Sequence, residues 1–144
     1  MFFRAALELG GQAPAIVTPS ADIDLSAKRI LFSKFLNNGQ ICLSANHVYV
    51  DPSVHDKFVE RVGFYLNEFL KGDAKDGMTR MISDRNYERV AGLLKGTQGK
   101  VAYGGQQDKA TKYIQPTVVT DVTMQGQSIV PSLLLHVPPS IFIK

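Results

Sequence analysis

The sequence predicts an α/β fold in which helices flank a largely parallel sheet. Three observations lead to this prediction. Short stretches with the alternating pattern of strands are separated by longer stretches whose apolar residues recur at helical spacing. The chain has 144 residues, enough for one compact domain with its own core. Hydrophobic residues make up 44% of it and charged residues 20%, the proportions of a globular domain.

Two strands are predicted near the start of the chain. Apolar residues alternate over residues 2–9, and Glu8 projects to the face opposite its apolar neighbours. Gly10 and Gly11 end this predicted strand. The stretch "PAIV" at residues 14–17 is the second predicted strand, and a polar loop follows it.

A helix and a tight turn come next. Asp22 or Asp24 can cap a helix whose apolar positions include Ala27, Ile30, Leu31 and Phe35. The helix is expected to stop at residues 37–39, "NNG", because Asn and Gly tolerate the left-handed conformation that helix ends often adopt. Cys42 therefore falls in a tight turn before the predicted strand "HVYV" at residues 47–50.

Two more helices and two more strand regions complete the regular pattern. Apolar residues recur at helical spacing from Val54 to Phe69, and Ser53 with Asp56 resembles a capping box. Ser83 is expected to cap a third helix that Gly96 closes. The stretches "KVAYGG" at residues 100–105 and "YIQPTVVTDV" at residues 113–122 are predicted strands.

The last stretch of the chain breaks this pattern. Between Asp121 and Lys144 there is no Asp, Glu, Lys or Arg, and the prolines at positions 131, 138 and 139 each remove a backbone donor. A central strand is therefore not expected here. The predicted domain spans residues 1–128, and residues 129–144 are expected to form a divergent, poorly ordered apolar tail.

Composition argues against several classes of function. The 16 Lys and Arg residues are scattered and form no run longer than the pair Lys28 and Arg29, so nucleic-acid binding is not expected although the net charge is +3. The three His residues are widely spaced and lack metal-ligand companions, so no metal site is expected. A single Cys cannot form an internal disulfide, which favours a reducing compartment and a cytoplasmic location. The sequence leaves contact with a membrane open.

Cys42 and Glu8 are the candidate catalytic residues, although each alone is ambiguous. A single Cys is more often a small buried hydrophobic residue than a nucleophile, and a Glu at a strand end is usually solvated. The turn around Cys42 can expose the thiol and leave its backbone N–H free to bind an oxyanion.

The combination of motifs is more specific than its parts. The stretches "LELGG" (7–11), "DIDLSAKRI" (22–30) and "KFLNNGQIC" (34–42), followed by "HVYV", resemble the aldehyde dehydrogenase superfamily. They match its glutamate and cysteine signatures in order, and their residues are most similar to those of the class 3 or fatty-aldehyde branch. The resemblance covers residues 3–128. It implies a partial catalytic domain of that family, with a Rossmann-like sheet.

The resemblance also implies roles for individual residues. Cys42 would be the nucleophile that attacks an aldehyde to form a thiohemiacetal, and Glu8 the general base that activates water to hydrolyse the resulting thioester. The cofactor would be NAD or NADP, with the backbone of Leu9 and Gly10 close to its nicotinamide. The substrate would be an aldehyde and the product a carboxylic acid.

The chain departs from the family at both ends, which leaves alternatives open. Members have a nucleotide-binding segment ahead of "LELGG" and an acidic-aromatic-Gly-Pro turn after the stretch that matches "VVTDV" (118–122). The expectation is therefore a fragment that is inactive alone. One alternative is a non-catalytic module that associates through exposed strand edges, as a homo-oligomer or with full-length subunits. Another is a residual Cys-dependent esterase.

Overall fold

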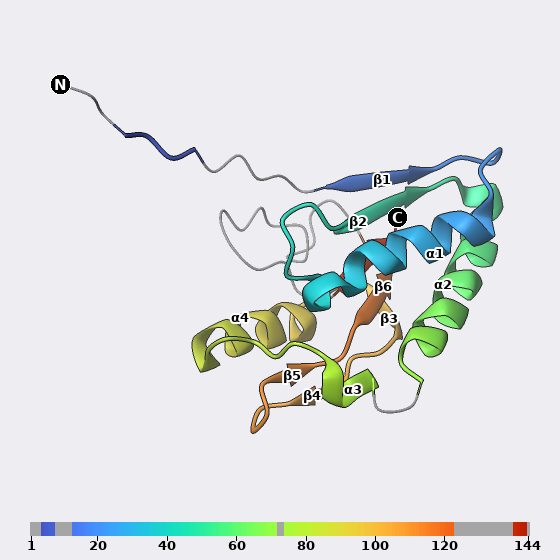
Figure 1. Cartoon of the computed structure of the whole chain (residues 1–144). Coiled ribbons are helices and arrows are strands. Elements are labelled where there is room, and N and C mark those ends of the chain that lie inside the picture. The colour runs from blue at the N-terminus through green and yellow to red at the C-terminus, as the bar shows by residue number, and fades with distance from the viewer. Residues whose placement is uncertain (1–3, 8–12, 72–73, 123–139, 144) are drawn as a thin grey trace.

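The computed structural model describes residues 4–7, 13–71, 74–122 and 140–143. Figure 1 shows helices packed on a central sheet. The strands are β1 (Pro14–Val17), β2 (His47–Val50), β3 (Lys100–Tyr103), β4 (Gln107–Asp108), β5 (Tyr113–Ile114), β6 (Thr117–Thr120) and β7 (Ser140–Ile143). The helices are α1 (Ile23–Phe35), α2 (His55–Phe69), α3 (Ala74–Gly77) and α4 (Asp84–Lys95), with single 3-10 turns η1 (Leu36–Gly39) and η2 (Pro52–Val54).

The main sheet is largely parallel, as the sequence predicts. Its strand order is β1-β2-β7-β6-β3, and β4 and β5 form a separate small sheet. The pairs β1–β2, β2–β7 and β6–β7 are parallel, whereas β3 runs antiparallel to β6 with an irregularity between Val101 and Tyr103. Helix α1 connects the adjacent parallel strands β1 and β2, which is the βαβ arrangement of α/β proteins.

Helices cover both faces of the sheet. Successive side chains of β6 point to opposite faces, and each contacts a different set of helices. Val118 packs in one core cluster with residues of α1 and α2, among them Leu31 and Phe58. Its neighbour Val119 points to the opposite face and packs in a second cluster with Val90 of α4. No helix within the described residues is long and apolar enough to cross a membrane.

The helix boundaries confirm the predicted caps. Asp22 accepts a hydrogen bond from the backbone N–H of Leu25 at 3.0 Å and caps α1. Ser83 caps α4 by accepting from the N–H of Asn86 at 3.2 Å, and Gly96 closes that helix. The predicted capping box at α2 is wrong. The Ser53 hydroxyl instead donates to Asp51, which caps the preceding turn η2.

The first predicted strand is also not found in the part of it that is described. Residues 4–7 have no regular secondary structure, and Leu7 is 80% exposed. Alternation alone does not make a strand, because a strand also needs a neighbour that satisfies its backbone groups. The rest of that stretch lies outside the described residues.

The clearest correction concerns the end of the chain. Residues 140–143 form β7, which lies in the middle of the main sheet between β2 and β6. Ile143 is fully buried in the core shared with α1 and α2. The expectation of a poorly ordered tail is therefore wrong for these four residues. The prolines at positions 131, 138 and 139, on which the expectation of no central strand rested, lie outside the described residues, and Ser140–Ile143 contains no proline.

Candidate functional site

Cys42 lies in a turn between η1 and β2, and its side chain is exposed. The turn leads into the amino end of β2. The interpretation of Cys42 as a buried core thiol is therefore wrong, and the sequence-based expectation of an exposed turn is confirmed. An exposed thiol meets the access requirement for a nucleophile.

Local sequence explains the shape of this turn. Asn37, Asn38 and Gly39 have φ angles of 48°, 52° and 75°, so three successive left-handed residues reverse the chain after α1. Asn and Gly adopt this conformation most readily. Beyond Cys42, both the backbone N–H and the hydroxyl of Ser44 donate to the carbonyl of Ile41, at 3.0 and 2.8 Å. These bonds close the turn around the cysteine.

The backbone N–H of Cys42 makes no hydrogen bond to any other described residue, so within this part of the structure it is available as a donor. The side-chain atoms Asn38 Oδ1 and Gln40 Nε2 are buried and likewise lack a partner among the described residues. Buried polar groups are normally hydrogen-bonded, so such atoms call for an explanation. The turn thus gathers unused polar groups close in sequence to Cys42.

Asparagines anchor the turn on both sides. Asn38, 5% exposed, donates from Nδ2 to the Thr79 carbonyl at 2.9 Å. Asn46, 7% exposed, accepts from Lys34 Nζ at 3.0 Å through Oδ1. The backbone N–H of Asn46 donates to the Ala13 carbonyl at 3.2 Å. Cys42 lies midway between these two anchors, so the position of its backbone is set from both directions.

Lys34 is the functional candidate that the sequence analysis did not identify. It lies in the last turn of α1 and is 2% exposed, and burial lowers the pKa of its ammonium to about 7. Its side chain makes no ion pair with a described residue. A signal was present in the sequence, because Lys34 continues the buried helical positions Ile23, Ala27 and Leu31.

The other predicted site residues lie outside the described part of the chain. They are Glu8, Leu9 and Gly10. Among the described residues, β1 and β2 are adjacent and parallel, with Pro14 opposite His47. Ala13, directly before β1, therefore lies at the same end of the sheet as the segment that leads from Cys42 into β2. The backbone N–H of Asn46 in that segment donates to the Ala13 carbonyl.

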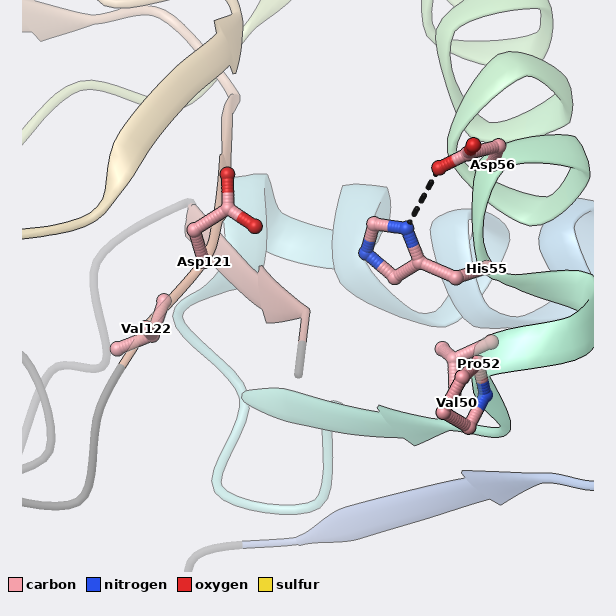
Figure 2. A pocket seen from close by; sticks show the side chains of 6 residues that line it. All are labelled: Val50, Pro52, His55, Asp56, Asp121 and Val122. Atoms are coloured by element: carbon pink, nitrogen blue, oxygen red, sulfur yellow. Dashed lines mark hydrogen bonds and ion pairs between the residues drawn. The ribbon is translucent and has the colours of Figure 1, made fainter.

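A cavity of about 380 Å³ lies elsewhere in the molecule (Figure 2). It is lined by Val50, Pro52, His55, Asp56, Asp121 and Val122. Val50 is the last residue of β2, so the cavity and the Cys42 turn lie at opposite ends of that strand. His55 is hydrogen-bonded to Asp56 at 2.9 Å, and Figure 2 shows Asp121 on the opposite wall. None of the predicted site residues lines this cavity.

The turn between β1 and α1 does not fit the phosphates of a dinucleotide. Such phosphates usually bind a Gly-rich turn at a helix N-terminus. The connection here is "TPSAD", with no glycine, and carboxylates of Asp22 and Asp24 flank the helix start. The Tyr65 hydroxyl and the Arg61 guanidinium both donate to Asp24, which keeps its pKa below the usual value and the group charged. An anion at this helix start would be repelled.

Comparisons with known proteins agree on one family. Residues 1–129 match the aldehyde dehydrogenase family. A dimeric NADP-preferring aldehyde dehydrogenase from Canis lupus familiaris is 39% identical over 140 residues, which are 96% of this chain and 30% of that protein. Aldehyde dehydrogenase family 3 member A2 from Rattus norvegicus is 31% identical over 140 residues, 96% of this chain and 28% of that protein.

Solved structures show the same relationship. The substrate-bound state of Staphylococcus aureus AldH superposes with a TM-score of 0.86 at 29% identity, covering 95% of this chain and 30% of that chain. Lactaldehyde dehydrogenase from Escherichia coli gives a TM-score of 0.81 at 30% identity, covering 94% and 30%. The chain thus spans roughly three-tenths of the length of the relatives it matches.

Proposed function

This chain belongs to the aldehyde dehydrogenase family, and from that premise we propose that it carries the nucleophile and the general base of an NAD(P)-dependent aldehyde oxidation. The observation that supports this proposal most directly is the exposed thiol of Cys42 in an anchored turn. The backbone N–H of Cys42 is the second element, since it has no acceptor among the described residues and can donate to an oxyanion.

The proposed chemistry divides between two residues of this chain. The Cys42 thiolate attacks the aldehyde carbon, and the carbonyl oxygen becomes the oxyanion of a thiohemiacetal. Oxidation to the thioester requires a hydride acceptor, for which the family uses NAD or NADP. The carboxylate of Glu8 then takes a proton from a water molecule that attacks the thioester carbon. The carboxylic acid leaves and the thiolate of Cys42 is regenerated.

Acylation of the purified chain by p-nitrophenyl acetate tests this proposal without a cofactor. Attack by the Cys42 thiolate forms a thioester and expels nitrophenolate, whose absorbance is measured during the first turnover. We expect Cys42→Ala to abolish this burst and the acetylation of the peptide containing residue 42. Leu43→Ala is the matched control, because Leu43 is the neighbouring exposed side chain of the same turn.

Glu8 is tested by the second step of the same reaction. Glu8→Gln should acylate at the wild-type rate but lose about a hundredfold in hydrolysis of the acetyl-enzyme, the usual loss on removing a general base. A burst of wild-type size in Cys42→Ala would overturn the assignment of the nucleophile. Equal deacylation in Glu8→Gln and wild type would overturn that of the base.

A second candidate function is association through β1. Among the described strands β1 pairs with β2 alone, so it lies at the edge of the main sheet, where Ile16 is 75% exposed. Unpaired edge strands are templates for pairing with another chain. We propose that a second copy or a full-length family member adds to this edge. Light scattering of wild type and Ile16→Lys tests this proposal, because the added charge at the edge should prevent association. The proposal would be contradicted if both proteins were monomers and neither co-purified with a full-length relative.

We propose a cytoplasmic location for the chain, and the free thiol of Cys42 supports it. Cys42 is a free, exposed thiol, and the cytoplasm is the compartment in which glutathione and thioredoxin keep thiols reduced. Fractionation of cells that express a tagged chain tests the location, and recovery from a secretory compartment would contradict it.

A further inference from the structure

Lys34 is buried in a place where an apolar side chain would be expected. Its exposed fraction is 2%, and the same face of α1 buries Ile23, Ala27 and Leu31. Burying an ammonium is costly unless it is paired, and within the described residues its hydrogen-bond partner is the neutral amide of Asn46. Burial of apolar surface therefore does not explain why a lysine occupies this position. The explanation has to come from the hydrogen bonds around it.

That geometry connects three segments that converge on the proposed nucleophile. Lys34 Nζ donates to Asn46 Oδ1 at 3.0 Å, which joins the end of α1 to the segment between Cys42 and β2. The backbone N–H of Asn46 continues to the Ala13 carbonyl at 3.2 Å, directly before β1. On the other side of the turn, Asn38 is held by Thr79. Lys34 is thus the buried support for one of the two anchors of Cys42.

We propose that Lys34 is a positioning residue for Cys42, acting through Asn46 to hold the turn in which the Cys42 backbone N–H faces a developing oxyanion. The inference rests on the proposed function, in which Cys42 is the nucleophile. Lys34 itself does not touch the reacting atoms. Its contribution is to fix the backbone of the turn before reaction, so that the donor requires no rearrangement when charge develops.

Two reactions of the same thiol separate this role from simple access. Acylation by p-nitrophenyl acetate passes through a tetrahedral oxyanion, so it depends on a correctly placed N–H donor. Alkylation by iodoacetamide displaces iodide in one step and forms no oxyanion, so it reports only thiolate content and exposure. The ratio of the two rate constants therefore measures positioning. A purely structural role, acting on stability or thiol access, leaves this ratio unchanged.

The variants test each end of the hydrogen bond. Lys34→Met removes the donor and keeps the length of the side chain, and Asn46→Leu removes the acceptor. Each is expected to lower the acylation-to-alkylation ratio about tenfold, toward the range reported for loss of an oxyanion donor. The double variant should be no worse than either single one, because both remove the same interaction. Asn46→Asp, which keeps an acceptor for Lys34, should retain the wild-type ratio.

Lys28→Met is the matched control on the same helix. Lys28 is exposed, lies beside the Tyr65 ring, and has no bond to the turn, so its substitution should leave both rates unchanged. An unchanged ratio in Lys34→Met, or an Asn46→Asp variant as impaired as Asn46→Leu, would overturn the proposal.

Hydrogen exchange keeps this test separate from that of the proposed function. Loss of the Lys34 bond should speed exchange of the Ser44 and Asn46 amides while the Val90 amide in α4 keeps its protection. If wild-type chain is never acylated at Cys42, the proposed function fails, and the exchange data alone decide whether Lys34 holds the turn. Equal acceleration at Ser44, Asn46 and Val90 would show only global destabilisation and would overturn the inference.

Discussion

Lys34 makes the stability of the chain depend on pH in the direction opposite to that of a lysine in a salt bridge, because its pKa is lowered and not raised. Burial lowers its pKa from 10.5 to about 7, whereas in the unfolded chain it stays protonated to higher pH. Between these values the unfolded state binds more protons than the folded state. The free energy of unfolding therefore rises with pH in this window, by at most about 1.4 kcal/mol per pH unit from this group.

Urea unfolding of wild type and Lys34→Met checks this prediction. The difference in unfolding free energy between the two proteins should shift in favour of wild type on going from about pH 7.5 to about pH 9.5. Below the folded pKa both states are protonated, so the difference should become constant there. Parallel pH dependence of wild type and Lys34→Met across the whole range would contradict the assignment.

At the scale of single elements, two serines with similar sequence contexts have different roles. Ser83 accepts from the Asn86 N–H and caps α4, whereas Ser53 donates to Asp51 and does not cap α2. Ser83→Ala should therefore lower the free energy of unfolding by about 1 kcal/mol. Ser53→Ala is the control and should stay within about 0.5 kcal/mol of wild type. Chemical denaturation measures both, and equal losses would contradict the difference in capping.

The helices were predictable because their signals are local. Asp22, Ser83 and Gly96 act within a few residues of themselves, and the apolar spacing of α2 and α4 identifies a buried face without knowledge of its partner. The same locality explains the error at Ser53, since the sequence does not show that Asp51 competes for its hydroxyl.

Strands were less predictable because they depend on distant partners. Residues 4–7 alternate like a strand but pair with no strand among the described residues, while Ser140–Ile143, near the apolar end of the chain, supplies a central one. Within the candidate site, the exposed turn around Cys42 followed from its Asn and Gly residues. The burial of Lys34 could not be predicted in the same way, because a lysine is almost never fully buried and its charge assigns it to the surface.

At the scale of the whole molecule, β7 connects the two halves of the sheet. Ile143 is fully buried, and β7 pairs with β2 on one side and β6 on the other. Ile143→Ala should lower the free energy of unfolding by about 2–5 kcal/mol, the usual cost of such a truncation in a core. Val101→Ala on the outer strand β3, where the side chain is 43% exposed, should cost less than about 1 kcal/mol.

Thermal or urea unfolding of these two variants distinguishes a central strand from a loosely attached tail. Similar small losses for Ile143→Ala and Val101→Ala would contradict the position of β7.

The central position of β7 also makes assembly of the main sheet a long-range event. Among the described strands, the β1–β2 pair and the β3–β6 pair are hydrogen-bonded into one sheet only through β7, although their side chains also share a core. Before β7 is in place, β2 and β6 each present an unpaired edge, and such edges invite aggregation. The register pairs His47 with Phe142, and contacts between residues so far apart in sequence favour slow folding.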